Sequence, residues 1–442
     1  MTTPPAQDHP VTRRDFVKAS TALGVGAAMG GMVAPAFASR LARSSEEAIN
    51  VGVIGAGGRG TGAAVNALEA HPAVRITAIA DLFPDRASGS LNHLLNHDLA
   101  TAADGTGRVT VTPDTTFTGF NAYKQLLAID DIDYVILATP PHFRPIHFNA
   151  AVDAGKHVFM EKPVAVDPAG VRTVLEAAAK ADGKKLSVVA GTQRRHEINY
   201  LQLMDRIHAG DMGDIVSAQC YWNQGGLWVH ERRPEYSDME WQCRNWLYFA
   251  WLSGDHICEQ HIHNLDVVNW AMGGPPVKCT GLGGREVRTD AKYGNIFDHH
   301  AVDYEYANGR QCMSMCRQID GTDGRVEEVL HGTRGRSVSR PGYAVIEGAN
   351  AWRFSDEYTN PYMVEHADLI ASMTGSGPRL NEARRVAEST LTAIMGRMST
   401  YTGKTVTWEH AMNSALDLSP PEYAFTSLET APVAVPGQTP LV

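Results

Sequence analysis

The chain of 442 residues lacks an excess of positive charge, since it has 39 Lys and Arg against 49 Asp and Glu and a net charge of −10. This balance argues against nucleic acid or an anionic membrane as a partner. Cysteines are few and form no C-x-x-C pair, which argues against a zinc knuckle or a redox motif. We interpret them as buried free thiols, although some could pair in an oxidising compartment. The six are Cys220, Cys243, Cys258, Cys279, Cys312 and Cys316.

A long hydrophobic run is missing as well, because the N-terminal apolar stretch is short, broken by glycines and carries a proline near its end. We therefore expect no stable membrane insertion. Arg13-Arg14 precedes this stretch and Ala36-Phe37-Ala38 ends it, which predicts a twin-arginine signal peptide over residues 1–38, cleaved near Ala38. A basic arm is the alternative. The signal predicts a periplasmic or otherwise exported protein that folds before the twin-arginine machinery exports it.

The length and the 43% apolar content suffice for a large core, most naturally in two domains. Between residues 49 and 195, short apolar runs alternate with helix-compatible segments, which predicts an α/β domain with a doubly wound parallel sheet. Residues 92–113 are polar and glycine-rich, so we expect an insertion there. The strands are expected at residues 51–54, 74–80, 134–138, 157–160 and 186–190, and the helices at residues 63–70, 122–127, 146–154 and 170–181.

Residues 196–410 predict a second domain of the α+β class, because strand-like runs follow the alternating half of the chain. The proline-rich residues 411–442 predict a C-terminal arm. The expected strands are residues 215–222, 279–288, 301–306 and 312–318, and two amphipathic helices with solvated charges are expected at residues 363–374 and 382–400.

A glycine fingerprint opens the first domain, where an apolar strand runs into a helix through Gly55-x-Gly57-x-x-Gly60. Gly55 permits the tight turn, Gly57 lets the backbone approach a pyrophosphate, and Gly60 lets the helix lie close to the strand. A second strand ends at Asp81, 21 residues after Gly60, where a carboxylate can accept hydrogen bonds from a ribose diol. Together these features predict a site for a nicotinamide dinucleotide.

Two loops at strand ends, residues 138–142 (ATPPH) and 161–163 (EKP), lie where ligands bind in open α/β sheets. A lysine in such a loop is ordinarily solvated, but the position of Lys162 beside the cofactor crevice favours a functional role. Asp81 favours NAD over NADP because it would repel a 2′-phosphate, while Arg59 keeps NADP open. We predict cofactor contacts from Gly55, Gly57, Gly58, Arg59, Gly60, Asp81, Thr139, Pro140, His142, Glu161 and Lys162.

The densest group of polar residues lies at residues 254–266, GDHICEQHIHNLD. On one helix Glu259 and His263 would stand at i and i+4, and Asp266 and Trp270 would continue the same stripe. Histidine, with an ordinary pKa of about 6.5, suits the role of base for a hydroxyl proton. A nearby ammonium group such as that of a lysine would stabilise the alkoxide that forms.

Two other interpretations of these histidines are open. His256, His261 and His263 with Glu259 could hold a metal ion, or the histidines could be structural. Because residues 261 and 263 of a helix point in different directions, we do not expect joint metal binding. We therefore predict no metal and three catalytic residues, Lys162, His263 and Glu259.

With these motifs in this order, the chain resembles the glucose–fructose oxidoreductase/inositol dehydrogenase (Gfo/Idh/MocA) superfamily over essentially all of its predicted mature length. The resemblance implies a Rossmann domain followed by a domain whose large open, mostly antiparallel sheet forms the substrate site. It also implies that Lys162 touches nicotinamide and substrate and that His263 is the base. Glu259 stands where the family usually has aspartate, and His261 stands where it often has glycine, which would narrow the site.

Aromatic and basic residues crowd the segment 221–251, which suits the packing of flat sugar rings, although half of these tryptophans could be core. We predict substrate contacts from Arg195, Trp222, Trp228, Asp266 and His261.

The sequence as a whole predicts an exported, homo-oligomeric NAD(P)-dependent oxidoreductase. Its substrate would carry a ring hydroxyl, as a sugar, glycoside or cyclitol does, and its dinucleotide would be tightly bound. An NAD-dependent glycosidase or lyase that oxidises the ring transiently is the alternative. A non-catalytic sugar-binding protein is disfavoured because Lys162 and His263 are both present.

Overall fold

The computed structural model describes residues 47–442. The predicted signal peptide, residues 1–38, lies outside the described residues. Within residues 47–442, no helix combines the length and the apolar character that crossing a bilayer requires.

The first sheet is parallel throughout and has the strand order β3-β2-β1-β4-β5-β6. It confirms the doubly wound sheet predicted from the alternating pattern. Its centre, where β1 lies between β2 and β4, is the point at which the strand order reverses, and ligands bind at such points. The strands are β1 (Ile49–Ile54), β2 (Val74–Asp81), β3 (Thr116–Thr118), β4 (Tyr134–Leu137), β5 (His157–Met160) and β6 (Val188–Ala190).

Helices that follow these strands pack on the sheet, and a helix from the far end of the chain joins them. The helix α13 (Pro361–Thr374) packs against α3 and β6. Residues 96–112 form the expected insertion, but residues 92–95 belong to a helix. The other helices of this half are α3 (Gly58–Ala70), α4 (Pro84–Leu95), α5 (Ala122–Leu127), α6 (Arg144–Asp153) and α7 (Pro168–Gly183).

The second sheet has the order β14-β13-β12-β11-β7-β10-β9-β8-β15 and is antiparallel except for the pair β7 and β10. It confirms the large, mostly antiparallel sheet. Short polar strands at residues 325–353 and 406–407 were not predicted, because they lack a sustained apolar alternation. The strands are β7 (Ile215–Gln224), β8 (Lys278–Gly284), β9 (His299–Glu305), β10 (Gln311–Gln318), β11 (Arg325–Gly332), β12 (Gly335–Arg340), β13 (Tyr343–Gly348), β14 (Trp352–Arg353) and β15 (Val406–Thr407).

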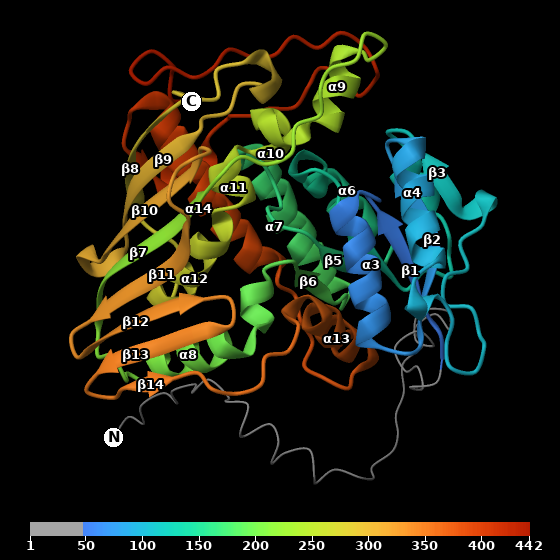
Figure 1. The fold of residues 1–442 in the computed structure, drawn as a ribbon, viewed down its shortest axis with the longest axis horizontal. Helices are drawn as coiled ribbons and strands as arrows, with labels where there is room; N and C mark the ends of the chain where they lie inside the picture. The colour runs from blue at the N-terminus through green and yellow to red at the C-terminus, as the bar shows by residue number, and fades with distance from the viewer. Residues whose placement is uncertain (1–46) are drawn as a thin grey trace, which may run out of the picture. The chain divides into compact units, whose positions relative to one another are not determined.

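The helix α14 (Ala383–Thr402) joins the two halves, since it packs against α7 on one side and against β8, β9 and α12 (Ile262–Met272) on the other (Figure 1). The prediction that the charges of the last two long helices face solvent is wrong for two of these charges, whereas Arg384 is exposed. Glu365 on α13 and Arg397 on α14 are buried. Where such a helix is covered by other elements, its charged side chains must be accommodated in the interior.

The C-terminal arm contains no helix or strand after α15 (Trp408–Asn413), but it lies against the body of the protein. The hydroxyl of Tyr423 is 2.8 Å from Nε2 of His142, and the ring of Phe425 stacks on Phe83 with centroids 5.8 Å apart. These contacts bring the arm to the loops that follow β2 and β4.

Candidate functional site

The glycine fingerprint has the geometry of a phosphate cradle. Gly55 has a φ of +96°, and a Cβ on Gly60 would lie 1.8 Å from the carbonyl oxygen of Gly55. By contrast, a Cβ on Gly57 or Gly58 would meet nothing within 4 Å. The N-cap Gly57 has no side chain to occupy the first N–H groups of α3, so these donors are available to an anion. The residues present therefore fit a dinucleotide pyrophosphate.

A cavity of about 470 Å³ opens beside this cradle, within the range of small-molecule sites. Seven of the eleven residues predicted to contact the cofactor line it, namely Gly55, Gly57, Gly58, Arg59, Asp81, Thr139 and Pro140. Gly60 is buried in the contact between α3 and β1. The remaining three, His142, Glu161 and Lys162, are not among the lining residues.

Asp81 shapes the cavity as well as lining it. Its Oδ2 accepts a hydrogen bond from the backbone N–H of Ala56 at 2.6 Å, and its Oδ1 accepts one from Phe83 at 2.9 Å. Burial raises the pKa of this carboxyl group, while the two backbone donors oppose the shift. Asp81 therefore ties the fingerprint loop to the loop after β2, at the place where the fold puts the ribose of a dinucleotide.

His142 does not reach the cavity, because its ring is buried against the C-terminal arm and bonded to Tyr423. Burial lowers the pKa of His142 to about 4, so the ring is neutral. Its neighbours Phe143 and His147 line the cavity instead. The loop turns through a 3-10 helix at Pro141–Phe143, so His142 and Phe143 point in different directions. The loop sequence did not indicate this turn.

Lys162, at the end of β5, connects the first half of the chain to the second. Its Nζ donates a hydrogen bond to the backbone oxygen of Glu259 and lies 3.3 Å from Oε1 of the same residue. Both side chains are about nine-tenths buried. The other carboxylate oxygen of Glu259 is buried without a hydrogen-bond partner in the described part of the chain. A buried carboxylate oxygen without a partner is costly, unless a ligand donates to it.

Glu259 and His263 do not share one helix, so the predicted continuous stripe is wrong. Glu259 ends the short helix α11 (His256–Glu259), and His263 lies in the first turn of α12. The break arises because the N–H of His261 donates to the carbonyl of His256, five residues back, which shifts the hydrogen-bond register. The two side chains nevertheless belong to one site, because Lys162 bonds Glu259 and acts electrostatically on His263.

The imidazole of His263 is held between the helix and the second sheet. The ring of Trp222 on β7 stacks on it at 5.6 Å with an angle of 24° between the planes, and the guanidinium of Arg194 lies over Trp222 at 5.7 Å. Burial first, and then the charges of Lys162 and Arg194, hold the pKa of His263 well below its usual range. The ring is therefore neutral and can accept a proton.

Three of the predicted substrate residues are placed away from this site. His261 is fully buried against the second sheet, with Nε2 at 2.6 Å from Oγ of Ser314. Asp266 is buried in an ion pair with Arg195 at 2.8 Å, and the guanidinium of Arg195 lies over Trp270 at 4.4 Å. These residues support the packing of α12, because the polar side of that helix faces other elements and not a cleft.

The other two predicted substrate residues are separated. Trp222 lies beside His263, whereas Trp228 is 42% exposed and lines the cofactor cavity.

Two residues of α13, Tyr362 and Glu365, lie beside Arg59 and Glu161 and were not predicted from the sequence. The Arg59 guanidinium lies 4.8 Å above the ring of Tyr362 and forms an ion pair with Glu161. Glu365, one turn further along α13, is fully buried with no partner for either oxygen in the described residues, and burial raises its pKa well above the usual range. No signal in the sequence could have shown that α13 packs against the fingerprint helix.

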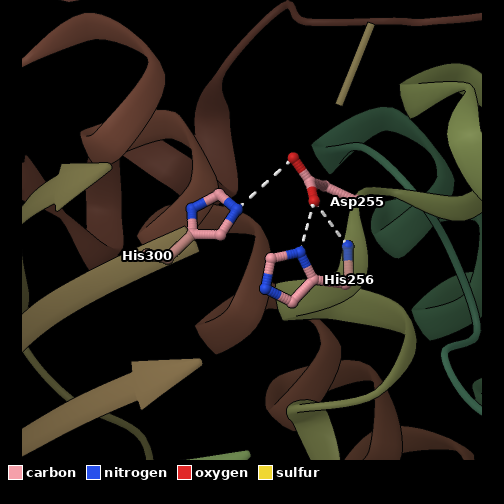
Figure 2. Close-up of side chains that lie close together, drawn as sticks. All are labelled: Asp255, His256 and His300. Atoms are coloured by element: carbon pink, nitrogen blue, oxygen red, sulfur yellow. Dashed lines mark hydrogen bonds and ion pairs between the residues drawn. The ribbon is translucent and has the colours of Figure 1, made fainter. Parts of the chain in front are cut away.

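A second cluster of histidines lies outside the site. Asp255, His256 and His300 offer ligand atoms within 4.8 Å of one another (Figure 2). The Asp255 carboxylate is already saturated, since it accepts from the N–H of Phe297 at 2.9 Å, from the hydroxyl of Tyr401 at 2.6 Å and from His256. We interpret the cluster as an anchor for α11, the helix that carries Glu259.

Comparisons with known proteins agree with this architecture. The family model of oxidoreductases with an NAD-binding Rossmann fold (GFO_IDH_MocA) matches residues 49–189, and the Gfo/Idh/MocA C-terminal domain matches residues 200–338. An inositol 2-dehydrogenase of Rhizobium meliloti is 24% identical over 260 residues, 56% of this chain and 72% of the relative. A glycosyl hydrolase family 109 protein of Streptomyces coelicolor is 26% identical over 242 residues, which are 52% of this chain and 47% of the relative.

An uncharacterized oxidoreductase of Streptococcus pneumoniae is 29% identical over 194 residues, which are 43% of this chain and 47% of the relative. The chain thus spans about half the length or less of several of these relatives.

Solved structures share the fold at low identity. The aldose–aldose oxidoreductase of Caulobacter crescentus superposes with a TM-score of 0.63 at 15% identity, over 82% of this chain and 100% of that one. Levoglucosan dehydrogenase in complex with NADH and levoglucosan superposes with a TM-score of 0.62 at 18% identity, over 82% of this chain and 99% of that one. Together, the two domain matches and the shared two-sheet fold show that the chain belongs to the Gfo/Idh/MocA family of oxidoreductases, with an NAD-binding Rossmann domain.

Proposed function

We propose that this protein transfers hydride between a ring hydroxyl of a sugar, glycoside or cyclitol and a tightly held NAD. The observation that carries the proposal is the meeting of Lys162 with Glu259, beside the neutral His263, at the boundary between the NAD-binding half and the second sheet. A cation, a carboxylate with one oxygen available to accept a hydrogen bond, and a neutral base lie together in one buried site. This combination suits the oxidation of a secondary alcohol.

Each of the three side chains has a distinct part in this reaction. NAD bound at the glycine fingerprint would supply the hydride acceptor. His263 accepts the hydroxyl proton, since its depressed pKa leaves the ring unprotonated and a nitrogen lone pair available. The ammonium of Lys162 stabilises the negative charge that develops on the substrate oxygen, and Glu259 holds that ammonium in place. The unpartnered oxygen of Glu259 accepts a hydrogen bond from a second hydroxyl of the ring.

A second candidate is an NAD-dependent glycosidase or lyase that oxidises the ring, eliminates the aglycone and returns the hydride. The similarity to a glycosyl hydrolase family 109 protein favours it as the alternative. The same base and cation would serve its first step, so the site geometry is compatible with both.

One assay separates the two candidates. The purified holoprotein is incubated with a panel of sugars, glycosides and cyclitols, while the absorbance of reduced nicotinamide and the released aglycone are followed together. Reduced nicotinamide without aglycone supports the dehydrogenase. Aglycone released with no net reduction supports the lyase, and no reaction of either kind across the panel contradicts both.

The proposal includes export by the twin-arginine route with cleavage near Ala38, and a homo-oligomeric state. A protein exported in the folded form would bring its NAD with it, so the hydride must leave through a second substrate or return to the first. We expect protein purified without added cofactor to contain close to one dinucleotide per chain. N-terminal sequencing of the periplasmic form, light scattering and mass spectrometry of the extract test these points. Empty protein that needs a large excess of NAD would contradict the closed cycle.

A further inference from the structure

The cofactor cavity has a wall that the Rossmann domain does not provide. Besides the fingerprint and the loops of the first sheet, it is lined by five residues that precede residues 254–266 in the second half of the chain. These are Trp228, His230, Cys243, Arg244 and Trp246. Because they lie outside residues 49–189, the family match to the NAD-binding fold does not include them.

We propose that residues 227–249 form the adenosine subsite of the bound dinucleotide, and that the ion pair between Arg244 and Asp85 closes this subsite so that NAD leaves slowly. We call residues 227–249 the adenosine cover. The inference extends the tight binding in the proposed function by naming the residues responsible for it.

The contacts of the cover place it at the ribose end of the cavity. Nε2 of His230 is 3.4 Å from the guanidinium of Arg86, and the guanidinium of Arg244 lies 3.9 Å above the ring of Phe83. Phe83 and Arg86 follow directly after Asp81, where the fold puts the adenosine ribose. The cover therefore stands over the adenosine half of the site, away from Lys162.

The cover offers aromatic surface to a flat base. The ring of Trp228 lies 4.9 Å from that of His230 and 5.9 Å from that of Trp246. Trp228 is nevertheless 42% exposed, although a large aromatic side chain loses favourable burial when it remains in water. A base that stacks on this ring would bury it, and base–aromatic stacking is a strong and sequence-tolerant contact.

The cover is anchored on both sides. Arg244 donates to both carboxylate oxygens of Asp85, at 3.1 and 3.2 Å, and this pair bridges the helix α9 (Asp238–Arg244) to α4 of the first half. On the other side, the N–H of Met239 donates to the carbonyl of Thr426 in the C-terminal arm at 3.2 Å. Release of the adenosine half would thus require the bidentate pair to break.

Retention is tested on the holoprotein by exchange of bound NAD for isotopically labelled NAD, followed by mass spectrometry without any sugar present. We expect Arg244→Ala and Asp85→Asn to raise the dissociation rate about tenfold or more. Arg336→Ala is the matched control, since Arg336 lies outside the cover, on β12, and its ion pair with the exposed Glu347 at 3.4 Å does not line the cavity. Wild-type exchange rates in both Arg244→Ala and Asp85→Asn would overturn the role of the ion pair.

The subsite is tested separately with ligand fragments. Trp228→Ala should weaken the binding of NAD and of ADP-ribose about tenfold, and should leave the binding of nicotinamide mononucleotide, which has no adenosine, unchanged. Equal losses for all three ligands, or no loss for any, would overturn the assignment. Neither test involves turnover, so an error in the proposed sugar substrate would leave both results standing, and circular dichroism checks that each variant is folded.

Discussion

The two ends of the NAD site differ in how completely their buried and charged groups are paired. At the Lys162 end, polar groups are buried and incompletely paired within residues 47–442, as at Nδ1 of His263 and Oε2 of Glu259. At the Arg244 end, the charged groups are paired with one another and packed on aromatic rings. Unpaired buried groups cost stability and persist where a ligand completes them, whereas paired groups hold a structure in place. This difference fits the proposed division of roles, in which the Lys162 end carries the chemistry and the Arg244 end holds the cofactor.

The most severe test of this comparison removes the cation or the base. Lys162→Ala and His263→Ala should each lower kcat by about 10³-fold or more, because both groups act on charge that forms only in the transition state. Bound NAD should remain, since the Arg244 end is intact. Lys180→Ala, on an exposed lysine of α7, is the control. Near-normal turnover of His263→Ala at neutral pH would remove His263 as the base.

A milder change sharpens the assignment of Glu259. Glu259→Gln keeps the backbone oxygen that accepts from Lys162 but removes the negative charge beside it. We expect kcat to fall by about 10- to 100-fold, less than for Lys162→Ala, because the ammonium loses a partner without being lost itself. Steady-state kinetics on the same substrate measure this. A loss as large as that of His263→Ala would make Glu259 a proton acceptor in its own right.

The ribose end provides a test of cofactor choice. Asp81→Ser removes the charge that would repel a 2′-phosphate and leaves Arg86 close by. We expect the preference for NAD over NADP to narrow by about tenfold, with little change in kcat. Equilibrium binding of both dinucleotides measures the ratio. An unchanged ratio would mean that Asp81 acts only through its two backbone hydrogen bonds.

The smallest effect concerns pH. The pKa of His263 is depressed below its ordinary 6.5, so this ring loses its proton at a lower pH than a free histidine does. The base form is thus complete above pH 6.5, and the acid limb of kcat/KM should lie well below that value. A pH–rate profile measures it. An acid limb centred at 6.5 or higher would show that burial and the charge of Lys162 do not act on the base in the working enzyme.

Local patterns predicted the NAD-binding half well. The fingerprint from Gly55 to Gly60 and the strand ending at Asp81 depend on contacts between near neighbours in the chain, so their spacing already contains the geometry. The same patterns failed for α13 and α14, where Glu365 and Arg397 were expected in solvent. Burial of those charges depends on packing between segments roughly 100 to 300 residues apart, which periodicity does not report.

The sequence by itself determined the parallel sheet and the phosphate cradle, and it supplied the chemical types of the predicted catalytic residues, since each of these follows from backbone freedom, side-chain chemistry and local order. Only the tertiary structure decided which polar residues work together. It placed Lys162 against Glu259, turned His261 and Asp266 into the interior, and brought Arg244 over the loop after β2. These outcomes depend on a register shift before α12 and on packing between distant segments, where a displacement of one residue redirects every side chain that follows.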